Sequence, residues 1–256
     1  MKNYKHPLRF LSIITVLSLT GLAFLTSANA AVLYSQTFNN VTGNNTVVGT
    51  VGWAGYLGAN ATAAPNNGSV DTVMIANVAG NPSTDGNSFL FAQNPNTASQ
   101  IFAATTTFAS INPTTITWKQ GNSDTAIQVR LMVQSGGNWY ASSTAFTNAS
   151  TYTAATFSSA GNAADVSKSF TFTTSASAWR SLTLTPGTSL ILGSVIGSNL
   201  SSSSITGVGF FVSEPSLNQK ARLDTLEIVP EPTTIVMFGL GLAGILCLRK
   251  RAHTTV

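Results

Sequence analysis

The sequence predicts an all-β protein whose body, residues 31–228, folds as an antiparallel two-sheet β-sandwich. Ser, Thr, Asn, Gly and Ala dominate this part of the chain, and no stretch of it sustains apolar residues at the 3.6-residue period of a helix. Apolar and polar residues instead alternate with a period of two, as in a strand with one buried face. Gly, Pro and Asn separate these short runs, which is typical of the turns in a sandwich.

The clearest strand is 127–133, where aliphatic residues at the odd positions alternate with Gln128, Arg130 and Met132. Gly136-Gly137-Asn138 follows, and the pattern resumes at 139–146, so we expect a β-hairpin here. The other predicted strands are 32–38, 70–76, 89–92, 101–108, 114–120, 167–173, 180–185, 205–213 and 222–229. The polar tracts 147–164 and 198–204 have a composition that is also typical of disorder, but the strands around them favour one folded domain.

The N-terminus has the three parts of a secretory signal peptide. Lys2, Lys5 and Arg9 give a positive start, and residues 10–25 are apolar apart from Ser, Thr and Gly. Ala28-Asn29-Ala30 then supplies a small-x-small site, which predicts a helical signal peptide over residues 1–30 and cleavage before Ala31. An uncleaved N-terminal anchor is the alternative.

The C-terminal segment, residues 229–256, also has three parts. Val229-Pro230-Glu231-Pro232 cannot extend a helix or fill a central strand, so the chain is extended there. Residues 233–248 are uncharged and predict a single transmembrane helix, and Arg249-Lys250-Arg251 stops it on the cytoplasmic side. The helix reaches roughly 24 Å, against roughly 30 Å of hydrocarbon, so it is a minimal anchor.

A Pro-Glu-Pro tripeptide, a short apolar helix and a terminal basic cluster resemble the PEP-CTERM sorting signal of exported bacterial proteins. The resemblance implies an exosortase-like membrane protease as a partner, which cuts near Pro230-Glu231-Pro232. It also implies a localisation: anchored in the inner membrane before processing, then at the cell surface or outside the cell. The alternative is a plain C-terminal anchor after a Pro-rich linker.

The two ends carry half of the positive charge of the chain. Residues 31–230 hold six Lys or Arg and seven Asp or Glu, so the net charge of the body is −1. This excludes the basic stripe that nucleic-acid binding needs. His6, His253 and Cys247 all lie in the end segments, so the body has no imidazole and no thiol. Catalytic triads, His- or Cys-based metal sites and disulfides are therefore excluded there.

The spacing of the strands and the closing segment 206–228 resemble jelly-roll modules of the galactose-binding or laminin-G-like kind. In such folds the first and last strands pair, and a structural calcium often lies near them. The resemblance implies Asp224 as a candidate ligand, with backbone carbonyls of residues 38–40 as partners. The alternative is that Asp224 is an ordinary hydrogen-bonded residue. No other cofactor is expected.

Aromatic residues are the candidates for binding a polysaccharide of the cell envelope. Gly52-Trp53-Ala54-Gly55-Tyr56 is the most suggestive segment, because its glycines are expected to put Trp53 and Tyr56 in a loop. Ordinary packing is the alternative for each aromatic side chain, including Trp118, Trp139, Tyr140, Tyr152 and Trp179.

Catalysis in the body would have to rely on carboxylates alone. Asp224 and Glu227 are three residues apart in a predicted strand, so their side chains should point to opposite faces. No acidic pair has an assignable role, and we expect no enzyme. The sequence therefore predicts an exported protein with a structural or adhesive role at the cell surface or in the extracellular matrix. The alternatives are a carbohydrate-binding module with a defined ligand, and a carboxylate glycosidase.

Overall fold

The structure is a computed structural model that describes residues 31–39, 45–66, 70–77, 88–150, 153 and 165–230. Residues 31–231 form one compact unit. Within the described ranges, no helix has the length and apolar character needed to cross a bilayer. Several predictions lie outside these ranges: the signal peptide with Ala28 and Ala30, the motif residues Glu231 and Pro232, the helix 233–248 and the cluster Arg249, Lys250 and Arg251.

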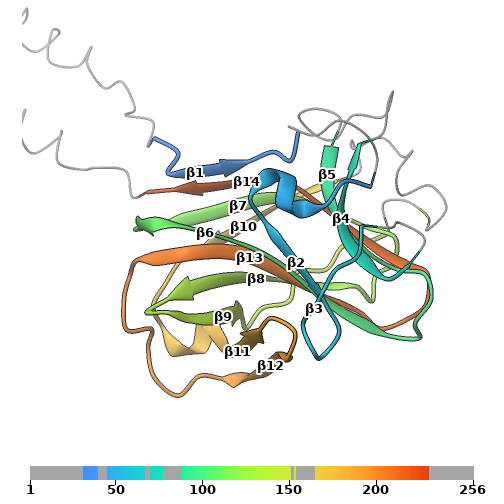
Figure 1. Cartoon of the computed structure of the whole chain (residues 1–256). Helices are drawn as coiled ribbons and strands as arrows, with labels where there is room; N and C mark the ends of the chain where they lie inside the picture. The colour runs from blue at the N-terminus through green and yellow to red at the C-terminus, as the bar shows by residue number, and fades with distance from the viewer. Residues whose placement is uncertain are drawn as a thin grey trace, which may run out of the picture. The chain divides into compact units, whose positions relative to one another are not determined.

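Two antiparallel sheets make up the described body, which confirms the predicted all-β sandwich (Figure 1). The first sheet has six strands, in the order β10 (Val166–Thr171), β7 (Thr115–Asn122), β14 (Gln219–Val229), β5 (Ser88–Asn94) and β4 (Thr72–Asn77), with β1 (Tyr34–Gln36) also paired to β14. The second has eight, in the order β12 (Ser189–Val195), β11 (Trp179–Thr185), β9 (Asn138–Ser142), β8 (Gln128–Ser135), β13 (Ile205–Glu214), β6 (Gln100–Ile111), β2 (Ala54–Leu57) and β3 (Thr62–Ala63). The described body also contains two short 3₁₀ turns, η1 (Val48–Val51) and η3 (Ala176–Ala178).

Every predicted strand overlaps an observed one, and β2, β3 and β12 are additions to the prediction. The predicted hairpin is the β8–β9 pair. Gly136 and Gly137 form its two-residue turn at φ 56° and 81°, a conformation that side chains with a Cβ rarely adopt. The first and last strands also pair as expected, Tyr34 opposite Ile228.

The main core lies between the two sheets and follows the predicted alternation. Val129, Leu131 and Val133 of β8 are fully buried in it. Trp118 of β7 lies at its centre, with its ring centroid 5.6 Å from that of Phe210 and 4.7 Å from that of Phe146. The sandwich therefore holds together through aromatic and branched side chains that alternate along both sheets.

A bulge in β14 changes which face its residues occupy. Asp224 pairs with Lys119 and Glu227 with Thr117, so two residues of β14 lie opposite one residue of β7. Thr225 takes a left-handed φ of 49° at this point. Because Thr117 and Lys119 share one face of β7, Asp224 and Glu227 also share a face. The expectation that their side chains point to opposite faces was wrong.

The outer face of the first sheet carries a buried ion pair. Arg222 of β14 donates from Nε and Nη2 to both carboxylate oxygens of Asp165, at 2.9 and 2.7 Å, and each side chain is 1% exposed. The Arg222 guanidinium also lies 4.9 Å from the ring centroid of Phe89. Burial raises the pKa of Asp165, and the hydrogen bond from Arg222 opposes that rise. The pair fixes Asp165, which precedes β10, against the middle of the sheet.

Replacing one partner of this pair should destabilise the fold strongly. Arg222→Met leaves the Asp165 carboxylate buried without its cation, which should lower the free energy of unfolding by about 3–5 kcal/mol. Urea unfolding followed by tryptophan fluorescence measures the loss. The double variant with Asp165→Leu removes both charges and should recover much of it, whereas additive losses in the double-mutant cycle would contradict the prediction.

Candidate functional site on the outer face of the second sheet

The outer face of the second sheet, opposite the main core, carries its own buried apolar residues. On β8, Met132 points away from the core residues Leu131 and Val133. It belongs to a group that we call the outer-face cluster: Ala61, Ala103, Met132, Ala141, Leu182, Leu190 and Phe211. A sheet that is buried on both faces must have something covering its outer side.

The cover comes from the two edges of the same sheet. Leu190 of β12 donates its backbone N–H to the carbonyl of Ala59 at 2.7 Å, and Gly187 donates to the carbonyl of Ala61 at 2.9 Å. These bonds join the turn between β2 and β3 to the β11–β12 hairpin, although the two lie at opposite ends of the strand order (Figure 1). The eight-stranded sheet is therefore curled, its outer face is concave, and the edge bonds close it over the outer-face cluster.

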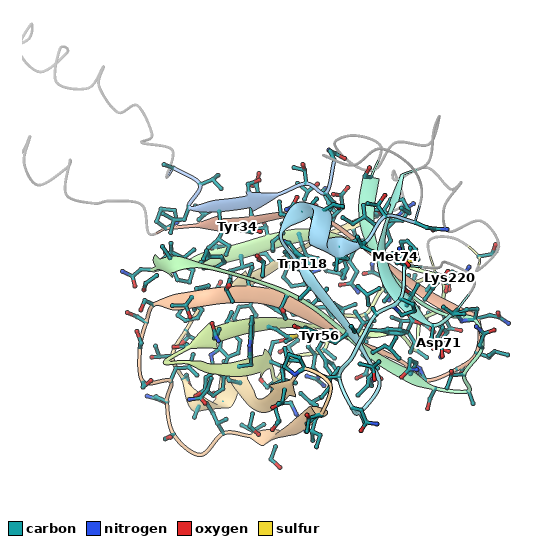
Figure 2. All side chains as sticks on the ribbon, viewed as in Figure 1. Tyr34, Tyr56, Asp71, Met74, Trp118 and Lys220 are labelled. Atoms are coloured by element: carbon teal, nitrogen blue, oxygen red, sulfur yellow. The ribbon has the colours of Figure 1, made fainter. Side chains whose placement is uncertain are left out.

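A hollow of about 300 Å³ opens at one end of this concave face. We call it the aromatic hollow, because half-buried Tyr56 of β2 and Trp139 of β9 line it. Figure 2 labels Tyr56 on β2. Its other lining residues are Gly52, Trp53, Ala54, Thr105, Thr106, Thr107, Leu184 and Pro186. Small side chains and hydroxyls thus surround two aromatic rings.

Two glycines of β13 let neighbouring groups approach its backbone closely on the concave side. Gly207 and Gly209 alternate with the core residues Val208 and Phe210, so they face the concave side. A Cβ on Gly207 would lie 2.9 Å from Cη2 of Trp139 and 2.9 Å from the carbonyl oxygen of Thr106. The indole therefore lies directly against the bare backbone of β13.

The polar ends of the two aromatic side chains have no partner in the described part of the protein. Neither the Tyr56 hydroxyl nor the Trp139 indole N–H makes a hydrogen bond there. Burial raises the pKa of Tyr56 above 10, so its hydroxyl is neutral at pH 7 and can both donate and accept. Neither atom is among the buried side-chain atoms that lack a partner, so both are open to solvent and can be reached by a ligand.

Trp53, the other predicted binding residue, belongs to the core. Its side chain is 3% exposed, its Nε1 donates to the Tyr34 hydroxyl at 3.0 Å, and its ring lies 5.2 Å from that of Phe38. The expected loop is instead strand β2 with the residue before it: Trp53 and Gly55 point inward, and Ala54 and Tyr56 point outward. The indole has no face free for a sugar ring. Of the other aromatic candidates, Trp118 and Trp179 are buried in the core and Tyr152 lies outside the described residues.

Asp224, the predicted calcium ligand, is fully buried and its Oδ1 accepts the N–H of Thr225 at 2.7 Å. The β1–β14 pairing ends at Gln36 opposite Leu226, so it does not extend to Asp224, which lies two residues earlier in the chain. Among the described residues, no group of three or more His, Cys, Asp or Glu side chains comes together as a metal site. Calcium binding at Asp224 stays a prediction.

Glu214 is a second fully buried carboxyl group of the described body. It ends β13, its Oε1 accepts the N–H of Ala221 at 3.1 Å, and its Oε2 has no hydrogen-bond partner. Burial raises its pKa well above 4.5, the charge of Asp71 raises it further, and the Ala221 N–H opposes the rise. The folded protein therefore holds this group protonated over a pH range in which the unfolded chain ionises it.

Stability should accordingly fall as the pH rises above about 4.5, the unfolded-state value, until the raised pKa of Glu214 is reached. The slope for one proton is about 1.4 kcal/mol per pH unit. Glu214→Gln keeps the shape and the acceptor for Ala221 but cannot ionise, so this part of the slope should vanish. Urea midpoints of both proteins between pH 4 and pH 8 measure the difference, and parallel profiles would show that Glu214 does not titrate as described.

The tail of the chain matches a known motif. Residues 229–251 match the PEP-CTERM protein-sorting motif. The chain carries this sorting signal. The match confirms the sequence-based identification of the tail, and the motif indicates an exported protein that is processed at a membrane. No curated protein matches the chain.

Several solved structures share the architecture of the body weakly. The K2 cleaved adhesin domain of Lys-gingipain is 11% identical, with a TM-score of 0.47 over 77% of this chain and 98% of that domain. A family 11 carbohydrate-binding module from Clostridium thermocellum, in complex with a β-1,3-1,4-mixed-linked tetrasaccharide, is 12% identical, with a TM-score of 0.42 over 77% and 95%. The CBM22-1 xylan-binding domain of Xyn10C from Paenibacillus barcinonensis is 11% identical, with a TM-score of 0.36 over 78% and 95%.

Proposed function

We propose that this protein is a non-enzymatic adhesive component of the cell surface or extracellular matrix that holds polysaccharide in its aromatic hollow. The observation that carries the proposal is the arrangement of Tyr56 and Trp139. Their rings line the same hollow, and their polar ends make no hydrogen bond within the described part of the protein, so they are free for a ligand.

The chemistry of a sugar fits this arrangement. A pyranose ring has an apolar C–H face that packs on an aromatic ring, and hydroxyls around its rim that need hydrogen bonds. Tyr56 and Trp139 supply both kinds of contact, and Thr105 and Thr107 add small polar side chains beside them. The hollow is half open to solvent on a concave face, so a long polymer can lie in it without having to enter by one end.

The fold ends where the sorting motif begins, which supports processing by an exosortase-like protease. The N–H of Thr114 donates to the carbonyl of Val229 at 2.8 Å, and Val229 opposite Thr115 is the last paired position of β14. A cut near Pro230-Glu231-Pro232 would therefore leave every strand of the sandwich intact. The protein would be held in the inner membrane until the cut and would then act at the surface or outside the cell.

A binding role also agrees with the chemistry of the body. Residues 31–230 contain no His and no Cys, so no imidazole or thiolate is present to act as a base or nucleophile. Asp224 and Glu227 share a face, but the Asp224 carboxylate is fully buried and holds the backbone of the bulge. It is not placed to meet a glycosidic bond.

The intact mass of the protein shows whether its two end segments have been removed. The protein isolated from its own host should have lost the segment before Ala31 and the segment after the Pro230 region. Replacing Glu231 with Ala should leave the C-terminal segment in place and keep the protein in the membrane fraction. A full-length wild-type species in the membrane would contradict processing.

Binding should depend on the two aromatic residues. Tyr56→Ala and Trp139→Ala should each weaken binding of the full chain, purified in detergent, by about tenfold or more. Isothermal titration calorimetry against soluble mixed-linked β-glucan, xylan and polygalacturonate measures the loss.

Tyr56→Phe is the matched control: it keeps the ring and removes only the hydroxyl, so it should lose less affinity than Tyr56→Ala. Near-UV circular dichroism shows whether each variant is folded. If wild-type protein binds none of these polymers, the role is structural without a polysaccharide ligand at this site.

A further inference from the structure

A second hollow, of about 410 Å³, opens on the same concave face. We call it the arginine hollow, because Arg130 of β8 is its one charged lining residue. Its other lining residues are Ala59, Ile101, Gln128, Leu190, Ile191, Leu192, Phe211 and Ser213. Ile101 borders this hollow and Thr105–Thr107 border the aromatic hollow, so the two lie about 13–20 Å apart along β6.

Arg180 of β11 accompanies Arg130 on this face. Arg180 pairs with Ala141, a member of the outer-face cluster, so its side chain points to the concave side. Arg130 pairs with Phe211, which belongs to the same cluster. Both arginines are half-buried. Burial lowers the pKa of Arg130, and the positive charge of Arg180 lowers it further. Ala141 also pairs with Met132, two residues from Arg130 on the same face of β8, so only β9 separates the two arginines along the sheet.

Backbone carbonyls hold both arginines but leave part of each guanidinium free. Arg130 donates from Nη1 to the carbonyls of Ser142 and Ser143, at 2.8 and 2.5 Å. Arg180 donates from Nε to the carbonyl of Gly193 at 2.8 Å. Nη2 of Arg130 and both Nη atoms of Arg180 make no hydrogen bond in the described part of the chain. The side chains are therefore oriented in advance, with donors left for a ligand.

Within the part of the chain that the structure describes, no carboxylate forms an ion pair with Arg130 or Arg180. The salt bridge found among the described residues is that of Arg222 and Asp165, which lies on the first sheet. The charges acting on Arg130 include Arg180 and no acid. Two fixed cations without a counter-charge, on a half-buried concave surface, attract an anion more strongly than exposed cations would.

From this geometry we propose that the polysaccharide is acidic, with sugar carboxylates that bind Arg130 and Arg180 while neighbouring rings pack on Tyr56 and Trp139. This inference rests on the proposed binding function. The planar fork of an arginine matches the two oxygens of a carboxylate, and such charge-assisted pairs are short and strong. The distance between the two hollows requires a chain of several sugar units, so a polymer or oligomer of uronic acids fits better than a single sugar.

The test compares three oligosaccharide probes on the full chain in detergent, by isothermal titration calorimetry. The probes are tetragalacturonate, its methyl ester, and a neutral mixed-linked β-glucan tetrasaccharide. Tetragalacturonate should bind at least about tenfold more tightly than its methyl ester, because esterification removes the charge and keeps the rings. Raising the salt concentration should weaken the first interaction and leave the others unchanged.

Variants assign the effect to the two arginines. Arg180→Gln should bring the affinity for tetragalacturonate down to that for the ester, about a tenfold loss, and leave the affinity for the ester unchanged. Arg130→Lys keeps the charge and should lose less. Lys119→Gln is the matched control: it removes one positive charge from β7 on the first sheet and should have no effect.

The outcomes separate this inference from the proposed function. If the charged and esterified probes bind equally, and Arg180→Gln changes neither, the acidic ligand is excluded while polysaccharide binding stands. If the wild-type protein binds no probe, both proposals fail. If Lys119→Gln weakens binding as much as Arg180→Gln does, the attraction is a general charge effect and the site is not the arginine hollow.

Discussion

Strand β13 lies in the middle of the second sheet, and its two faces pack in two different environments. Its even-numbered residues Val208, Phe210 and Val212 fill the main core between the sheets. Its odd-numbered residues face the concave side, where Gly207 and Gly209 present bare backbone and Phe211 presents a ring. Because the side-chain period of a strand is two, a slip of one residue would place glycines in the core and bulky side chains against Trp139 and Thr105. The core and the candidate site are therefore fixed by the same register.

The concave face also depends on hydrogen bonds between the two edges of the second sheet. An eight-stranded sheet has two exposed edges, each a template for pairing with another chain. Here the turn at Ala59–Ala61 and the hairpin at Gly187–Leu190 bond to each other, so these parts of the edges are occupied within the molecule. The same bonds cover the outer-face cluster and leave open hollows at its two ends. The bonds that join the two sheet edges therefore also shape the surface that we propose binds polysaccharide.

The sequence predicts the strands well because their alternation is local, and it predicts the site poorly because the site depends on which face each residue occupies. Trp53 and Tyr56 look equivalent between glycines, yet their separation of three residues in a strand sends one inward and one outward. Asp224 and Glu227 are also three residues apart, but the bulge at Thr225 places their side chains on the same face. One signal was available: the Gly-Val-Gly at 207–209 places two glycines on one strand face, which marks a close approach of another group. Nothing local connects it to Trp139, which lies about 70 residues earlier in the chain and meets it only through β8.

The charges and apolar residues divide the chain into a body and two targeting segments, one at each end. Half of the Lys and Arg residues flank the two apolar end segments, while the body is nearly neutral overall. A nearly neutral body makes the position of individual charges more important than their sum. Arg222 is neutralised by Asp165 inside the fold, whereas Arg130 and Arg180 are held by carbonyls that orient them without cancelling their charge. Two cations without a counter-charge on a concave face destabilise the fold through mutual repulsion and desolvation. A bound anion would remove this destabilisation.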